Sequence, residues 1–234
     1  MFDLGDKLAL YFKMGKEIPY WQTFVSYSFD EGESFSGAEE LIKGDISGGR
    51  GPVKNKAIKI KSNRILAPAS TEIGSWKAFI DISDNGGESF RKTEIKCPEA
   101  GLIQPTLWED ENGNIHALMR SNKGFIYRSD SFDNGETWCD AYKTNIPNNN
   151  SGIDLVKAEG KIYLVCNPVE GNWAARSPLS LFVSEDNGES FTKLIDLETE
   201  MGEFSYPAII SGKNTLYITY TYNRKSIVFT EINL

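Results

Sequence analysis

The sequence is poor in the residues that build metal sites and disulfide frameworks. It contains one histidine, His116, which excludes a histidine-rich metal site, and we expect neither a metal nor another cofactor. Its three cysteines, Cys97, Cys139 and Cys166, are odd in number and lack the spacing of metal ligands. We therefore expect free thiols in a reducing compartment.

Positive charge and long apolar runs are also scarce. The 234 residues include 25 lysines and arginines against 33 aspartates and glutamates, and the net charge of −8 argues against nucleic acid as a partner. No apolar run approaches the length of a membrane span, and the first residues lack the regions of a signal peptide. The sequence thus predicts a cytoplasmic protein without a membrane partner, and a signal lost ahead of Met1 is left open.

What the sequence does contain is one eight-residue pattern in four copies, S-x-D-x-G-x-x-[F/W], with Asn85 replacing the acid in the second copy. The copies are Ser28–Phe35, Ser83–Phe90, Ser131–Trp138 and Ser184–Phe191. Successive copies start 55, 48 and 53 residues apart, and such a period suits four-stranded blades. Aromatic and β-branched residues dominate the apolar residues, so the sequence predicts an all-β propeller.

The chemistry of the pattern is that of a hairpin turn. Asp or Asn accepts hydrogen bonds from backbone N–H groups two residues on, and glycine supplies a left-handed conformation. The final aromatic is expected to be buried between neighbouring blades; these residues are Phe35, Phe90, Trp138 and Phe191. A catalytic or calcium-binding series of carboxylates is the alternative. Because the turns are spread around a ring, we interpret the repeat as scaffold.

Each unit divides into strands A to D, with the pattern at the turn between C and D. In the third unit we expect strand A at Ile103–Trp108, B at Ile115–Arg120 and C at Gly124–Ser129. Only a B-like and a C-like strand precede the first copy, and the last unit stops after a C-like strand at Lys225–Ile232. The sequence therefore predicts a single domain over residues 1–234, with about five blade-like units in an incomplete ring.

A propeller brings its D-to-A and B-to-C connections together at one face, around the central funnel. Polar and aromatic side chains at these connections are therefore candidate site residues. They are Asn55, Lys56, Gln104, Asp154 and Tyr206 in the D-to-A connections, and Glu72, Arg120, Asn167, Trp173, Arg176, Tyr222 and Arg224 in the B-to-C connections. Guanidinium groups hold a carboxylate bidentately and aromatic faces pack on sugar C–H surfaces, so this set suits a sugar acid.

The repeated pattern resembles the Asp-box of bacterial neuraminidase repeats, which is found in sialidases and their relatives. The resemblance covers nearly the whole chain and implies a six-bladed parent whose N-terminal blade is missing here. It implies that Arg120 and Arg176 hold a carboxylate and that Tyr206 is the nucleophile, since sialidases use tyrosine for this role. Gln104 matches the position of the glutamate that activates the tyrosine, and an amide cannot act as that base. Glu72 or Asp154 would supply acid/base chemistry.

The function implied is a sialidase-like glycoside hydrolase acting on a terminal sialic acid, or another acidic or deoxy sugar, of a glycan. Two alternatives stay open: a carbohydrate-binding propeller without catalysis, and an inactive truncated product of a larger gene. Because of Gln104 and the missing blade, we expect poor turnover of generic sialosides. The open blade edges, with Leu8, Leu10, Tyr217 and Ile218 partly uncovered, predict self-association.

Overall fold

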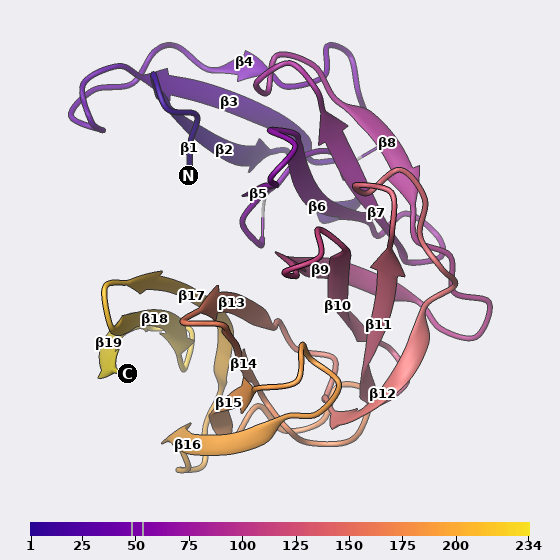
Figure 1. Cartoon of the computed structure of the whole chain (residues 1–234), viewed down its shortest axis with the longest axis vertical. Coiled ribbons are helices and arrows are strands. Elements are labelled where there is room, and N and C mark those ends of the chain that lie inside the picture. Colours follow the sequence, from indigo (N-terminus) through magenta and orange to yellow (C-terminus); the bar gives the residue numbers. More distant parts are fainter. Residues whose placement is uncertain (48, 53) are drawn as a thin grey trace.

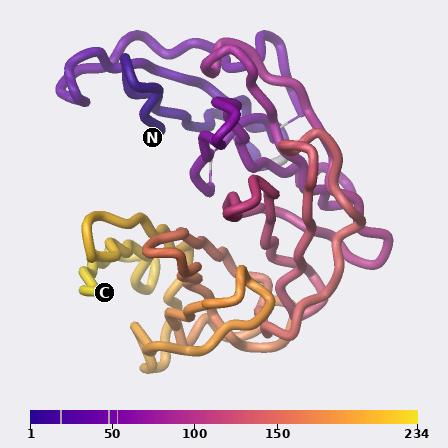
Figure 2. Tube along the Cα trace, viewed as in Figure 1, coloured from indigo at the N-terminus to yellow at the C-terminus, as the bar shows by residue number. Residues whose placement is uncertain are grey.

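Five antiparallel β-sheets follow one another around an open arc in the computed structural model, which describes residues 1–47, 49–52 and 54–234 and, at Pro19, the backbone alone (Figure 1). The N-terminal sheet and the C-terminal sheet lie at the two ends of the arc, as the trace of the chain also shows (Figure 2). Each sheet is one blade of a β-propeller of the sialidase type. The predicted all-β propeller is thereby confirmed.

The blades have the following strands. The first contains β1 (Phe2–Asp3), β2 (Leu8–Met14), β3 (Gln22–Ser28) and β4 (Glu39–Glu40), with a short 3-10 helix η1 at Ile18–Tyr20. The second contains β5 (Ile58–Lys59), β6 (Ile65–Thr71), β7 (Lys77–Ser83) and β8 (Arg91–Glu94), and the third β9 (Leu102–Glu109), β10 (Ile115–Ser121), β11 (Phe125–Ser131) and β12 (Tyr142–Pro147). The fourth contains β13 (Asp154–Ala158), β14 (Lys161–Cys166), β15 (Leu179–Ser184) and β16 (Thr192–Glu198), and the fifth β17 (Phe204–Gly212), β18 (Thr215–Tyr222) and β19 (Ser226–Asn233).

The two ends of the arc differ from each other. The first blade is more complete than the sequence predicted, because the two-residue strand β1 pairs with β2 in the place of an A strand. The fifth blade has three strands in the order β17-β18-β19 and, within the described chain, no fourth strand pairs with β19. That open edge agrees with the prediction of a last unit without strand D.

The four copies of the repeated pattern form nearly identical turns between the third and fourth strands of the first four blades, as predicted. In the third copy, Ser131 Oγ accepts a hydrogen bond from Gly135 N at 2.9 Å, and Asp133 Oδ1 accepts one from Thr137 N at 2.9 Å. Asn85 makes the same contact with Ser89 N at 3.0 Å in the second copy. The amide oxygen therefore replaces the carboxylate without loss of the turn.

The glycines of these turns pack against the preceding blade. A Cβ added at Gly135 would lie 3.0 Å from Leu66, and one at Gly188 would lie 2.8 Å from the ring of Trp108. In the first copy, the nearest atom to such a Cβ at Gly32 belongs to Leu8 of the same blade, at 3.7 Å. No preceding blade covers this turn within the described chain.

The aromatic residues of the pattern are less buried than predicted. Phe90, Trp138 and Phe191 are half-buried and pack on the apolar clusters that they share with the preceding blade. Phe35 remains 39% exposed, because no described blade lies on its side. The core of the molecule therefore lies between adjacent blades rather than inside each one, and the faces at the ends of the arc have no neighbouring blade among the described residues.

Candidate functional site

A cavity of about 550 Å³ opens at the end of the strands opposite the repeated turns. The connections that line it are those between the second and third strands of each blade and those between successive blades. Eight of the twelve candidate residues line this cavity: Asn55, Glu72, Gln104, Arg120, Trp173, Arg176, Tyr206 and Arg224. All five blades contribute to its wall, since Lys13 and Trp21 of the first blade also line it.

Lys56 and Asp154 do not line the cavity and instead hold the blades together. Asp154 is 3% exposed and accepts hydrogen bonds from Lys56 Nζ at 2.8 Å, Thr106 Oγ1 at 2.8 Å and Ile209 N at 3.0 Å. These partners come from three other blades. The expected acid/base role of Asp154 stays a prediction, and the enclosure of this carboxylate in a central bridge of hydrogen bonds argues against it.

Asn167 and Tyr222 also lie outside the cavity. Asn167 is buried, and its Nδ2 donates to Pro178 O at 2.8 Å and to Phe204 O at 3.0 Å, so its amide ties the fourth blade to the fifth. Tyr222 packs its ring on Phe204, with 5.1 Å between ring centroids. Both residues were candidates for substrate binding, and the structure gives them packing and hydrogen-bonding partners inside the protein.

The cavity concentrates positive charge in a chain whose net charge is −8. Its described wall contains five basic side chains, Lys13, Lys54, Arg120, Arg176 and Arg224. Glu72 is the one carboxylate among the described residues of this wall. Low-dielectric walls focus the field of such a cluster, so the cavity attracts an anion.

Arg120 lies at the floor of the cavity, at the end of β10, and is 3% exposed. Its Nε donates to Asn150 Oδ1 at 3.0 Å and its Nη1 to Gln104 Oε1 at 3.2 Å. Burial lowers the pKa of Arg120 to about 10, an effect that the nearby Tyr206 hydroxyl opposes. The guanidinium group therefore stays charged at neutral pH.

Arg176 and Arg224 share a carboxylate that the sequence analysis missed. Glu203 Oε1 accepts from Arg176 Nη1 at 2.9 Å and from Arg224 Nε at 2.6 Å. Partial burial of Glu203 raises its pKa, but the hydrogen bond from Arg224 and the charges of both arginines outweigh this effect and hold the pKa low. Arg176 also lies over the ring of Tyr206, 5.3 Å from its centroid. Glu203 follows β16 in a polar loop, where nothing in the sequence distinguishes it from other surface acids.

Tyr206 and Gln104 have an unusual backbone conformation in common. Their φ angles are 53° and 54°, in the left-handed region that residues other than glycine seldom adopt. Each interrupts the pairing of the innermost strand of its blade, and each is followed by a proline, Pro207 or Pro105. Strain of this kind clusters at functional sites, and here it turns both side chains to the cavity, where Tyr206 is 41% exposed.

Lys54 is a second residue that the sequence analysis missed. Its Nζ donates to Ile153 O at 2.7 Å and to Pro207 O at 2.9 Å, across the centre of the propeller. Burial lowers the pKa of Lys54 to about 7, although the charge of Asp154 opposes the shift. A neutral amine still has two N–H groups for the two carbonyls. The contact with Pro207 O supports the backbone immediately after Tyr206.

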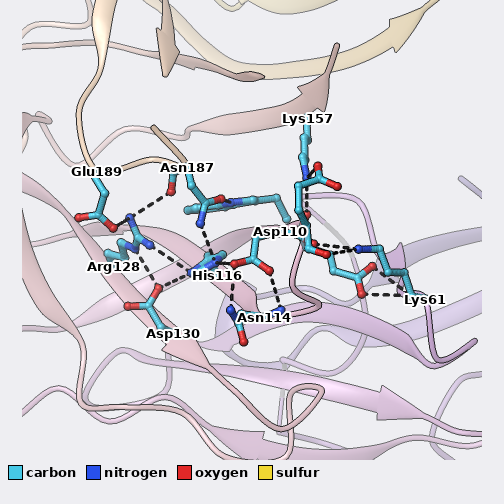
Figure 3. A network of polar contacts seen from close by, with 12 residues as sticks. Lys61, Asp110, Asn114, His116, Arg128, Asp130, Lys157, Asn187 and Glu189 are labelled. Atoms are coloured by element: carbon cyan, nitrogen blue, oxygen red, sulfur yellow. Dashed lines mark hydrogen bonds and ion pairs between the residues drawn. The ribbon is translucent and has the colours of Figure 1, made fainter. Parts of the chain in front are cut away.

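The single histidine lies in a polar network away from the cavity, near the repeated turn of the fourth blade (Figure 3). His116 Nδ1 is 2.5 Å from Asp130 Oδ1, and its Nε2 is 3.3 Å from Asp110 Oδ2 and 3.2 Å from Asn187 Nδ2. Arg128 pairs with Asp130 at 2.9 Å. Because Asn187 belongs to the fourth blade, this network joins two blades and has a structural role.

Among the described residues, no three His, Cys, Asp or Glu side chains are grouped so that they could hold a metal ion. The part of the chain that the structure describes also has no helix that is both long and apolar enough to cross a membrane.

The chain belongs to the BNR repeat-like domain family, whose model matches residues 1–218. Its fold is similar to that of solved sialidases. The Hadza microbial sialidase Hz136 superposes with a TM-score of 0.75 and 18% identity, covering 92% of this chain and 44% of that one. For the K499G mutant of NanB sialidase from Streptococcus pneumoniae, the TM-score is 0.69 and the identity 20%, covering 85% and 32%.

A third structure is the intramolecular trans-sialidase from Ruminococcus gnavus in complex with oseltamivir carboxylate. It matches with a TM-score of 0.66 and 16% identity, covering 100% of this chain and 60% of that one. The present chain thus spans between about a third and three fifths of the length of these proteins. At identities of 16% to 20%, the similarity to these proteins is evidence for the fold alone.

Proposed function

We propose that the cavity holds the terminal acidic sugar of a glycan, and that the chain is a sialidase-like glycoside hydrolase of low turnover. The observation that carries the proposal is the basic character of the cavity: three arginines and two lysines line it with one carboxylate, in an otherwise acidic protein. These basic side chains suit the carboxylate of a sugar acid as their ligand. The similarity to proteins named as sialidases and trans-sialidase supports a sialic acid as the first candidate.

Hydrolysis in this site would use Tyr206 and Glu72. Tyr206 Oη would attack the anomeric carbon and lose its proton to water, while protonated Glu72 would donate a proton to the leaving oxygen. A water molecule, deprotonated by the Glu72 carboxylate, would then attack the anomeric carbon and break its bond to Tyr206 Oη, which would regain a proton from water. Arg120 and Arg176 would hold the carboxylate. Gln104 would limit the rate, because its amide cannot take the phenolic proton and its oxygen accepts from Arg120.

A fluorogenic sialoside tests this function. We expect slow release of the fluorophore by the purified chain and loss of that release in Tyr206→Phe. A Gln104→Glu variant should turn over at least about tenfold faster, since a positioned general base typically contributes about 10²–10⁴-fold. Gln104→Asn, which keeps an amide, is the matched control. Equal rates for the unchanged chain and Tyr206→Phe would contradict the assigned nucleophile, and turnover as fast as an ordinary sialidase would contradict the role of Gln104.

A carbohydrate-binding propeller without catalysis is the second candidate function, and Gln104 is the observation that favours it. In that case the acidic sugar binds, but no variant at Gln104 or Tyr206 changes a rate. Binding without measurable release, even in Gln104→Glu, would select this candidate.

A further inference from the structure

Lys54 contributes an amine to the wall of the cavity, and backbone carbonyls hold this amine in place. Its Nζ donates to Ile153 O at 2.7 Å and to Pro207 O at 2.9 Å, and both acceptors are neutral. The charge of Asp154 acts on Lys54, but this carboxylate pairs with Lys56 Nζ at 2.8 Å. Lys54 is therefore oriented by hydrogen bonds to neutral groups, whereas Lys56 is oriented by an ion pair.

Two arginines share the cavity with this amine. Arg120 Nε donates to Asn150 Oδ1 at 3.0 Å, and Lys54 Nζ binds the same short segment three residues later, at Ile153 O. Arg120 and Arg176 both line the cavity, as Lys54 does. A carboxylate that these guanidinium groups hold therefore lies in the same cavity as the amine.

Gly152 leaves room for Lys54 and Tyr206 to lie close to each other. A Cβ added at Gly152 would lie 3.0 Å from Lys54 Cε and 3.3 Å from Tyr206 Cδ1. The lysine stem and the phenol ring thus both pack on this glycine, and a larger residue there would displace one of them. The phenol also brings a hydroxyl that donates and accepts protons to the wall of the cavity.

The surroundings of Lys54 favour its neutral form. Burial lowers the pKa of Lys54 to about 7, an effect that the charge of Asp154 opposes and the charges of Lys56 and Arg120 reinforce. At pH 7 about half of the Lys54 amines are therefore neutral, against about one in 2,500 for a lysine with the ordinary pKa of about 10.4. Lysines that are desolvated or adjoin other cations are activated as nucleophiles in this way.

We propose that Lys54 is a nucleophile that binds α-keto acids covalently, as an imine, in this cavity. Arg120 and Arg176 hold the carboxylate, and Lys54 Nζ forms a bond to the adjacent carbonyl carbon. The carbonyl oxygen leaves as water with the two amine protons, so that a C=N bond replaces the C=O bond, and hydrolysis reverses the step. The inference goes beyond the proposed function, because it needs the cavity and its arginines but no glycosidic bond.

Reductive trapping with pyruvate tests the proposal. Cyanoborohydride at pH 7 donates hydride to the imine carbon and leaves a stable carboxyethyl group on the amine, and peptide mass spectrometry locates the modified lysines. Lys54 should be modified at least about tenfold faster than Lys213, an exposed lysine in the turn after β17, because more of its amine is neutral. In Arg120→Gln the trapping at Lys54 should slow at least about threefold, whereas Arg91→Gln, at the opposite face, should leave it unchanged.

A neutral probe and two variants at the amine sharpen the test. Methyl pyruvate lacks the negative charge, so the preference for Lys54 over Lys213 should be at least about threefold smaller with this ester. Lys54→Arg keeps N–H donors but has no amine, and it should abolish the fast trapping. Gly152→Ala should slow the trapping, because the added methyl group displaces the lysine stem or the phenol.

The outcome separates this inference from the proposed function. Trapping at Lys54 that is no faster than at Lys213 would overturn the inference, as would fast trapping at Lys13 in its place. If N-acetylneuraminic acid binds but pyruvate is not trapped at Lys54, the inference fails and the proposed function stands. Fast trapping at Lys54 in a chain that releases no sugar from sialosides would support the inference and contradict the hydrolase.

Discussion

At the scale of single residues, the cavity is shaped by side chains whose neighbours lie in other blades. Lys54 shows this best, because its ammonium group reaches Ile153 O and Pro207 O from the segment before β5. Those contacts place the Lys54 amine beside the strained backbone of Tyr206. Burial without a direct carboxylate partner explains why Lys54 loses its proton more easily than other lysines.

The low pKa of Lys54 predicts a pH dependence of stability. Its pKa is about 7 in the folded protein and about 10.4 in an unfolded chain. Between these values the unfolded state binds more protons, so this residue makes the unfolding free energy rise with pH, by at most about 1.4 kcal/mol per pH unit. Urea unfolding measures the unfolding free energy of the unchanged chain and of Lys54→Met. From pH 7 to pH 10, the value for the unchanged chain should rise relative to the value for Lys54→Met. A difference that stays constant over this pH range would refute the assignment.

The sequence could place some candidate residues at the cavity, because the order of strands in a blade determines which connections reach the funnel face. Arg120 lies near the end of β10, Tyr206 near the start of β17 and Arg176 in the connection between β14 and β15, and all three line the cavity. Asp154 and Asn167 were also candidates, but they do not line the cavity, because both are buried against neighbouring blades. Lys54 and Glu203 were missed because their importance depends on partners about 20 to 150 residues away, which no local pattern reveals.

At the scale of the element, the repeated turn stabilises the hairpin through a fixed set of hydrogen bonds. Asp133 accepts from the backbone and the hydroxyl of Thr137 and from Ser131 Oγ. These bonds and the blade period could be predicted from sequence. The exposure of Phe35 could not, because burial of that ring depends on a blade that would have to precede it.

Asp133→Ala should therefore lower the unfolding free energy by about 1–3 kcal/mol, since the turn amides lose their acceptor. Affinity for an acidic sugar, measured per folded molecule, should stay the same, because the turn lies at the opposite end of the strands. Thermal unfolding and a binding titration on the same sample measure both quantities, and the exposed Asp140→Ala serves as a control. A loss of affinity in folded Asp133→Ala would show that the repeated turns are more than scaffold.

At the scale of the whole molecule, the arc leaves two blade faces without a neighbour in the described chain. On the fifth blade, Ile227 is 77% exposed and Phe229 is 58% exposed, and Phe229 stacks on Tyr217 at 6.1 Å. The sequence analysis expected Ile218 to be uncovered as well. This was wrong, because Ile218 points to the fourth blade and is fully buried. On the first blade Leu8 and Leu10 are half-buried.

These faces predict that the purified chain dimerises or aggregates. An unpaired strand edge such as β19 recruits other strands, and an exposed apolar face favours association. Analytical ultracentrifugation over a wide concentration range should show a sedimentation coefficient that rises with concentration, and Phe229→Lys should reduce this rise. A compact monomer at every concentration would mean that the exposed edges are harmless in solution.

The central claim is that the cavity recognises the carboxylate of a sugar, and the most direct measurement compares a sugar acid with its neutral ester. Calorimetric titration of the unchanged chain with N-acetylneuraminic acid and with its methyl ester should show that the acid binds about 10–100-fold more tightly, as expected for charged hydrogen bonds worth about 1.5–3 kcal/mol. In Arg120→Gln this preference should largely disappear, whereas Arg91→Gln, at the opposite face, should retain it. Equal affinity of the unchanged chain for the acid and the ester would contradict the account.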